Sequence, residues 1–225
     1  MSPERAILRD ALGIAIASGA YAISFGAIST AAGVSLLQTC ALSVLMFTGA
    51  SQFALVGVIG AGGSVWAGGS VWAGAATAAL LGSRNALYGV RLSTLLGVRG
   101  ARRVAAAHFV IDETTAMAIA RDDPRQSRYA FWATGFALFV FWNVGTLIGA
   151  LATQAIPNPK VFGLDAAPPA AFLALLAPRL RSREPLAIAL ASAAAAIVLL
   201  PFVPAGVPLL VIAVLVALYG VMRRR

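Results

Sequence analysis

Long apolar runs separated by short arginine-bearing connections dominate the chain. From Ala11 to Ser83 there is no Asp, Glu, Lys, Arg or His. A helix that rises ~1.5 Å per residue needs ~20 apolar residues to cross the ~30 Å hydrocarbon layer of a bilayer. If the protein were a soluble domain, it could not keep a first third so poor in ionic groups out of water. The pattern therefore predicts an all-α integral membrane protein.

The apolar runs mark the candidate spans. They cover residues 11–33, 37–60, 66–98, 129–153, 165–178, 186–201 and 206–222. The run 66–98 has a flaw near its middle, and a further apolar stretch, 104–120, contains ionic residues. No extended loop separates the runs. We expect one transmembrane domain over residues 1–225, a polytopic helical bundle of about 6–8 transmembrane segments with at least one broken or re-entrant helix.

Arginines gather at the ends of the apolar runs, as the positive-inside rule describes. Those at 121–128, 179–183 and 223–225 fall on one side if each of the last four runs crosses once. This arrangement places the C-terminus in the cytoplasm.

The N-terminal half of the chain leaves two arrangements open. If 66–98 and 104–120 each cross once, the arginines at 99–103 lie outside, against the rule. If 66–98 folds back on itself, these arginines lie inside, and 104–120 returns to its starting side. Both arrangements require an irregular element between residues 80 and 120.

Composition restricts the classes of function. Hydrophobic residues make up 60% of the chain and charged ones 11%, so the net charge of +9 indicates anchoring at the bilayer and not nucleic-acid binding. One His and one Cys leave no zinc site and no Ser-His-Asp triad, and no glycine-rich phosphate loop is present. We expect no enzyme activity, no metal and no cofactor. The single cysteine, Cys40, has no partner for an intrachain disulfide.

Polar residues at membrane depth are costly and are therefore the functional candidates. Gly49, Ala50, Ser51 and Gln52 lie within the second apolar run. This segment is either a locally unwound helix, whose free backbone groups bind an ion or a carboxylate, or a small-residue packing patch with Gln52 bonded to a neighbouring helix.

A second group of candidates begins at Arg84 and Asn85. Tyr88 and Arg91 follow, and positions 84, 88 and 91 share a helical face. An arginine at mid-bilayer costs roughly 2.5–3.5 kcal/mol on insertion scales. We therefore expect acidic partners, and Arg84 and Arg91 match Asp112 and Glu113 two for two. The alternatives are a purely structural ion pair and arginines that snorkel to the interface.

The acidic residues belong to a third group. His108, Asp112 and Thr115 are spaced to share a helical face, while Glu113 points elsewhere. A carboxylate in a dry setting holds its proton more tightly and can load and release it as access alternates. The alternative is an amphipathic helix whose polar face meets lipid headgroups. Asp165 either caps a helix or begins one whose N–H groups bind an anion.

At these residues the chain resembles the AzlC family, the large subunit of bacterial branched-chain amino-acid exporters. The similar stretches follow one another along the chain at Ser24–Gly26, Phe47–Phe53, Ser83–Gly89, Asp112–Glu113 and Gly163–Leu173. Gly82, Asn85 and Ile111 stand where the family has Asn, His and Thr. If the family's His handles protons, this chain either uses His108 for this role or has no histidine in it.

The resemblance implies a secondary-active exporter of Leu, Ile, Val or Met in the bacterial inner membrane. It would work by alternating access with proton or cation exchange, together with a small AzlD-like membrane subunit. A zwitterion needs a cationic, an anionic and an apolar contact. Arg84 or the Ser51 region suits its carboxylate, and Asp112 or Glu113 suits its ammonium or the coupling proton. The alternatives are a membrane channel and a non-transporting scaffold subunit.

The candidate site residues fall into three sets. The substrate-binding candidates, with Phe25 and Phe53 as the pocket wall, are Phe25, Gly49, Ser51, Gln52, Phe53, Arg84, Asn85 and Tyr88. The coupling candidates are His108, Asp112 and Glu113, and the helix-cap or anion-site candidate is Asp165.

Overall fold

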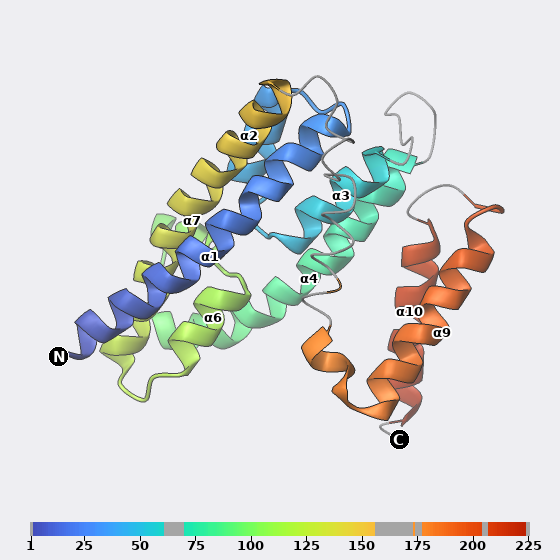
Figure 1. Ribbon diagram of the computed structural model, residues 1–225. Helices are drawn as coiled ribbons and strands as arrows, with labels where there is room; N and C mark the ends of the chain where they lie inside the picture. Colours follow the sequence, from blue (N-terminus) through green and yellow to red (C-terminus); the bar gives the residue numbers. More distant parts are fainter. Residues whose placement is uncertain (1, 61–69, 156–172, 174–176, 204–206, 224–225) are drawn as a thin grey trace.

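The computed structural model describes residues 2–60, 70–155, 173, 177–203 and 207–223, and the regular structure in these ranges is helical (Figure 1). The elements are α1 (Pro3–Ala31), α2 (Leu36–Leu45), α3 (Ala50–Gly60), α4 (Ser70–Leu96), α5 (Ala101–His108), α6 (Asp112–Ile119), α7 (Pro124–Ala155), the 3-10 turn η2 (Ala177–Arg181), α9 (Arg183–Leu199) and α10 (Val207–Arg223). By length and composition, α1 and α7 are each able to cross a bilayer. The predicted all-α class is confirmed for the described residues.

Several predicted spans correspond to single helices. The runs 129–153, 186–201 and 206–222 form the central parts of α7, α9 and α10. From Ser70 to Leu96 the run 66–98 also forms one uninterrupted helix, so the flaw in the apolar pattern near its middle does not break the helix. The Ser83 hydroxyl donates to the Leu80 carbonyl within the helix, which satisfies a polar group that would otherwise favour a break. Segment 165–178 lies largely outside the described residues.

Glycines hold α1 and α7 together in the most extensive packing between two described helices. A Cβ added at Gly26 of α1 would overlap the backbone carbonyl oxygen of Thr146, and one added at Gly149 of α7 would overlap that of Ile23. Close approach through small residues is how helices associate in lipid, where no hydrophobic force draws them together. The two long helices therefore form a tightly packed pair.

A hairpin of two short helices, α2 and α3, follows α1. The irregular segment 46–49 separates the two helices, and Ser35 begins α2 with a capping box. A Cβ at Gly60, the last residue of α3, would lie 3.2 Å from that of Ala32, just beyond α1. The chain therefore leaves this hairpin at the end where it entered. The run 37–60 is two half-length helices and not one span, and the predicted unwinding lies immediately before α3.

The Gln52 side chain completes the backbone at this break. Its Oε1 accepts a hydrogen bond from the Gly49 N–H (3.2 Å), and its Nε2 donates to the Leu42 carbonyl (2.9 Å). Gly49 has a φ of +62°, in the left-handed region that favours glycine. Helix ends leave backbone groups without helical partners, and burying such groups unpaired is costly. Gln52 therefore joins the ends of the two half-helices.

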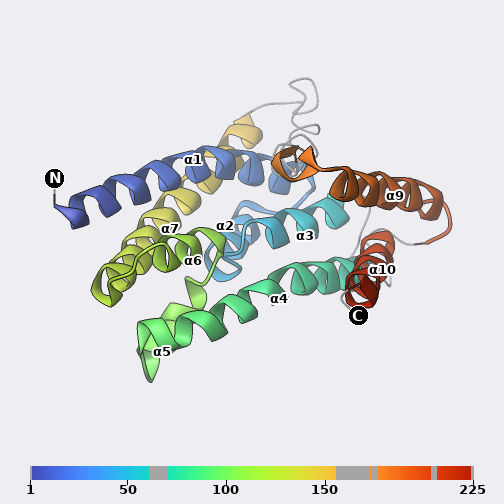
Figure 2. The same cartoon turned by 90° about the horizontal axis from the view of Figure 1, so that it is seen from below.

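A second hairpin, α5 and α6, breaks at residues 109–111. The Thr114 hydroxyl donates to the Phe109 carbonyl (2.6 Å) and accepts from the Ile111 N–H (3.1 Å). Arg128, near the start of α7, donates to the carbonyl of Leu95, near the end of α4 (3.2 Å). The chain therefore enters and leaves this hairpin at one end of the bundle, opposite to the end used by α2 and α3 (Figures 1 and 2).

The two breaks meet in the interior. The rings of Phe47 and Phe109, one from each break, have centroids 6.1 Å apart and lie edge to face. Phe139 of α7 packs against both rings, at 5.2 Å and 5.7 Å. The hairpins thus touch each other through aromatic side chains at their tips.

The structure matches neither of the two predicted arrangements of the N-terminal half as a whole. The described part of the run 66–98 does not fold back, as in the first arrangement, whereas 104–120 returns to its starting end, as in the second. The predicted irregular element between residues 80 and 120 is the 109–111 break. Asp10 of α1 lies 3.5 Å from Arg121 in the α6–α7 connection. The arginines at 99–103 therefore share one end of the bundle with the N-terminus (Figure 2).

The last two described helices form a separate antiparallel pair beside α4 (Figure 1). Arg223 at the end of α10 pairs with Glu184 in the first turn of α9. Apolar side chains on both helices are exposed, among them Leu190, Ile197 and Val214. This pair buries little of its surface against the rest of the described chain.

The α1–α7 packing predicts which glycines tolerate a methyl group. Gly26→Ala and Gly149→Ala should each destabilise the protein by on the order of 1–3 kcal/mol, because the obstructing atoms are backbone and cannot rotate away. Thermal unfolding of the purified protein in detergent measures this as a lower Tm. Gly13→Ala on α1, where nothing lies within 4 Å of the added Cβ, is the matched control. Equal Tm values for all three variants would contradict the packing.

The bridge at the first break makes a second prediction. Gln52→Leu should cost about 1–3 kcal/mol of folding free energy, since the Gly49 N–H loses its partner and the Leu42 carbonyl loses one of two. The same Tm measurement tests it. Gln126→Leu is the control, because the Gln126 side chain makes no hydrogen bond to any described residue. A Gln52→Leu protein as stable as this control would show that the bridge is dispensable.

Candidate functional site

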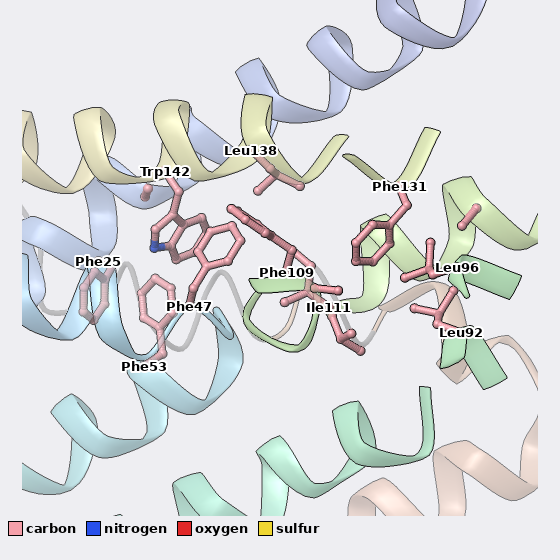
Figure 3. Packing of buried hydrophobic residues seen from close by; sticks show 14 of the residues in the cluster. Phe25, Phe47, Phe53, Leu92, Leu96, Phe109, Ile111, Phe131, Leu138 and Trp142 are labelled. Atoms are coloured by element: carbon pink, nitrogen blue, oxygen red, sulfur yellow. The ribbon is translucent and has the colours of Figure 1, made fainter. Parts of the chain in front are cut away.

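Aromatic rings from three helices surround the beginning of α3. Phe25 comes from α1, Phe53 from α3 and Trp142 from α7 (Figure 3). Phe25 lies 5.5 Å from Phe53 and 6.4 Å from Trp142, and Tyr21 of α1 lies 4.8 Å from Phe53, all measured between ring centroids. The structure thus brings together the two phenylalanines predicted as a pocket wall. We call these four residues the aromatic box.

Two polar atoms of the aromatic box are buried without a hydrogen-bond partner among the described residues. They are the hydroxyl of Tyr21 and the indole Nε1 of Trp142. Trp142 is only 4% exposed, and its indole nitrogen lies on the side of the ring toward Phe25 (Figure 3). Buried polar side-chain atoms in proteins normally have a partner. These two donors therefore mark a position suited to a hydrogen-bond acceptor.

The first turn of α3 adjoins the aromatic box. A Cβ on Gly49 would lie 3.7 Å from the edge of the Trp142 ring, and one on Gly82 of α4 would lie 3.6 Å from the Ser51 hydroxyl. The backbone N–H groups of Ala50 and Ser51 precede the helical hydrogen-bond pattern and find no acceptor in the described part of the chain. Of the predicted residues here, Gln52 has a structural role, because its side chain bridges the break with two hydrogen bonds.

An ion pair links α4 to α6. Arg84 lies 2.9 Å from Asp112, and the two side chains are 37% and 41% exposed. The acidic partner predicted for Arg84 is therefore confirmed, and it is Asp112. The expected second pair does not form, because Arg91 is exposed and the half-buried Glu113 makes no ion pair with any described residue.

Further polar atoms surround this ion pair. Asn85 Oδ1, Arg84 Nε and Thr115 Oγ1 are buried and lack a partner among the residues that the structure describes. Tyr88, one turn further along α4, packs against the main hydrophobic core. Beside the Arg84–Asp112 contact, α4 and α6 thus carry buried polar atoms with unused hydrogen-bonding capacity.

His108 lies apart from the acidic residues that the sequence grouped with it. The predicted face shared by His108 with Asp112 and Thr115 is wrong. The helix breaks at 109–111, so the helical spacing that would align His108 with the other two residues is interrupted. The imidazole instead packs among aromatic rings, 6.0 Å from Phe47 and 5.7 Å from Phe139. Asp165, the predicted cap or anion site, lies outside the described residues.

Sequence reasoning missed Tyr21, Trp142, Phe47 and Phe109. In an apolar run, an aromatic residue is equally suited to lipid, to an interface or to a core. The partial signal that existed was Gly49, two residues after Phe47, since a glycine with positive φ marks a turn of the backbone.

These groups together suit the binding of a small amphipathic molecule. The aromatic box supplies apolar contact and two hydrogen-bond donors, the start of α3 supplies free N–H groups, and the α4–α6 ion pair supplies both signs of charge. No three His, Cys, Asp or Glu side chains of the described residues are placed to hold a metal ion.

Comparison with known proteins gives the family. A family model described as AzlC protein matches residues 13–156. This range contains both hairpins and all of α1 except its first turns. The chain is similar to the inner membrane protein YgaZ of Escherichia coli (strain K12), with 29% identity over 153 residues that cover 66% of this chain and 60% of YgaZ. The chain therefore spans about 60% of the length of this relative. No solved structure matches. Because the family model covers more than half of its length, this membrane protein belongs to the AzlC family.

Proposed function

We propose that the protein is a secondary-active transporter that exports branched-chain and related hydrophobic amino acids, Leu, Ile, Val or Met. It acts by alternating access, with proton or cation exchange as its energy source. Membership of the AzlC family and similarity to an inner membrane protein support a membrane transport-related function. The observation that carries the proposal is the meeting of two broken hairpins at Phe47 and Phe109.

Broken helices suit transport for a physical reason. Irregular backbone is tolerated at membrane depth only where protein or a water-filled cavity satisfies its polar groups. Transporters use such breaks to place helix ends at a substrate near the bilayer centre. Here α3 and α6 both begin in the interior, one from each hairpin, so their N-terminal ends lie near the point of contact.

The groups near the breaks match a hydrophobic zwitterion. The aromatic box fits an aliphatic or thioether side chain. Asp112 or Glu113 fits the ammonium group or the coupling proton, and Arg84 or the Ser51 region fits the carboxylate. Because the Arg84–Asp112 pair is internally neutral, substrate or proton binding at Asp112 changes how strongly it holds Arg84. This gives a link between loading and a change of conformation.

In the membrane, α1, α4 and α7 cross in this proposal, and each hairpin enters and leaves from one face. The 27 residues of α4 extend ~40 Å, enough to cross the hydrocarbon layer. The arginine-bearing end is cytoplasmic by the positive-inside rule. The protein is then a multi-pass protein of the bacterial inner membrane. The small AzlD-like subunit belongs to the same proposal, and co-purification with such a subunit tests it.

Labelling single cysteines tests this topology. In a Cys40→Ser background, Arg102→Cys and Arg125→Cys should react with a membrane-impermeant maleimide only after the cells are permeabilised. Trp72→Cys, at the start of α4 and 78% exposed, should react in intact cells. Labelling of positions 102 and 125 from opposite faces would show that α5 and α6 cross and do not return.

Efflux measurements test the transport role of the polar groups. In cells loaded with a Val- or Met-containing dipeptide, Asp112→Asn, Glu113→Gln and Arg84→Gln should each lower amino-acid efflux by about tenfold or more. Each substitution removes one charge from the site between α4 and α6, and the loss of a charged interaction of about 1.4 kcal/mol has this effect. Saturable efflux that also shows counterflow in reconstituted vesicles distinguishes a carrier from a channel.

Two exposed residues provide matched controls for these substitutions. Asp122→Asn and Arg91→Gln make the same chemical changes, and neither residue has an ion-pair partner among those described. Both controls should retain efflux. Unchanged efflux in Asp112→Asn and Glu113→Gln at normal expression would remove the carboxylates from the mechanism.

A further inference from the structure

We propose that the N-terminal end of α3, together with Trp142 and Tyr21, forms a carboxylate subsite. The inference deepens the proposed function, on which its biological role rests, because it assigns one end of the solute to one group of donors. Arg84, the other candidate for this role, is left to hold Asp112.

Two hydrogen-bond donors at the start of α3 adjoin two donors of the aromatic box. The N–H groups of Ala50 and Ser51 are free at the start of an 11-residue helix. Trp142 Nε1 and the Tyr21 hydroxyl are buried without a partner in the described part of the chain. Gly49 brings the helix end against the Trp142 ring, with 3.7 Å from its ideal Cβ to the ring edge. These donors come from three helices, so the fold and not local sequence gathers them.

Charge favours an anion here over the other helix start in the interior. The first turn of α6 carries Asp112 and Glu113, which already balance the positive end of its helix dipole. The first turn of α3 carries no acidic residue. The positive end of α3 is thus uncompensated by its own side chains, and a helix N-terminus with free N–H groups attracts carboxylates.

Arg84 is less available for the carboxylate. Its guanidinium lies 2.9 Å from Asp112, so a solute carboxylate would have to displace an existing ionic partner. The donors at α3 have no such competitor among the described residues. The buried rings of Phe25 and Phe53 beside them reduce access of water and supply apolar contact, which suits a carboxylate borne on a short hydrophobic chain.

Binding to the purified full chain tests the subsite with three probes. Radiolabelled valine carries both charged groups, isovalerate keeps the carboxylate without the ammonium, and isobutylamine keeps the ammonium without the carboxylate. Trp142→Phe and Tyr21→Phe each remove one donor and keep an aromatic ring. Each should raise the Kd for valine and for isovalerate about tenfold, the typical effect of losing a hydrogen bond to a charged group. Competition by isobutylamine should not change.

Two substitutions of the same chemistry elsewhere control for indirect effects. Trp132→Phe changes another tryptophan of α7, and Tyr129→Phe changes an exposed tyrosine. Both should bind all three probes as the unmodified protein does. Size-exclusion profile and Tm establish that every variant is folded.

The outcomes separate the subsite from the proposed function. Isovalerate binding that is unaffected by Trp142→Phe and Tyr21→Phe overturns the subsite, and so does the absence of isovalerate binding to the folded unmodified protein. If isovalerate binds and both variants weaken it, the subsite stands, even where cells show no amino-acid efflux. That last result would instead refute the proposed function.

Discussion

The fold depends on satisfying backbone hydrogen-bonding groups at two helix breaks in the interior. In hydrocarbon an unpaired N–H or C=O costs several kcal/mol of free energy, about as much as many apolar contacts together contribute to stability. Gln52 bonds to the backbone on both sides of the first break, and Thr114 does so at the second. These two side chains therefore stabilise the broken arrangement at both hairpins. The hairpins, and every group they place in the interior, follow from this local pairing.

The breaks give the molecule a functional asymmetry. Both α3 and α6 begin in the interior, but only α6 begins with acidic residues. One helix start is therefore compensated by its own carboxylates and tied to Arg84, while the other presents free donors beside aromatic rings. A solute with opposite charges at its two ends fits such an arrangement in one orientation. This is the physical basis on which we propose recognition of a zwitterion.

The contacts that hold the helices differ in kind. The α1–α7 pair is held backbone against backbone at glycines, where a small displacement meets carbonyl oxygens. The tips of the hairpins meet through the rings of Phe47, Phe109 and Phe139. Rings lying edge to face can slide and rotate with less change in energy than interlocked backbones. In the proposed transport cycle, the α1–α7 pair is the scaffold and the hairpins are the parts that rearrange.

The sequence by itself determined the helical class, the membrane environment and much of the polar inventory. Hydropathy sets the free energy of transfer into lipid, and this quantity is local, so the charge-free run from Ala11 to Ser83 sufficed. The cost of an intramembrane arginine likewise predicted an acidic partner for Arg84. For Gly49–Gln52 each of the two interpretations left open is confirmed in part, because Gly49 ends the irregular segment 46–49, whereas Ala50, Ser51 and Gln52 are helical and Gln52 bonds to the neighbouring helix α2.

Tertiary structure alone decided how those pieces are used. Half-length helices and one full span share the same composition, so only the Ala32–Gly60 contact shows that 37–60 turns back. The break at 109–111 separates His108 from the helix face of Asp112. A prediction that assumed one continuous helix could not show this. Trp142 meets the start of α3 across more than ninety residues of chain, and in an apolar run nothing local tells a buried indole from a lipid-facing one. Long-range contacts, not local hydropathy, fix which polar atoms are left without partners and therefore where a ligand is able to bind.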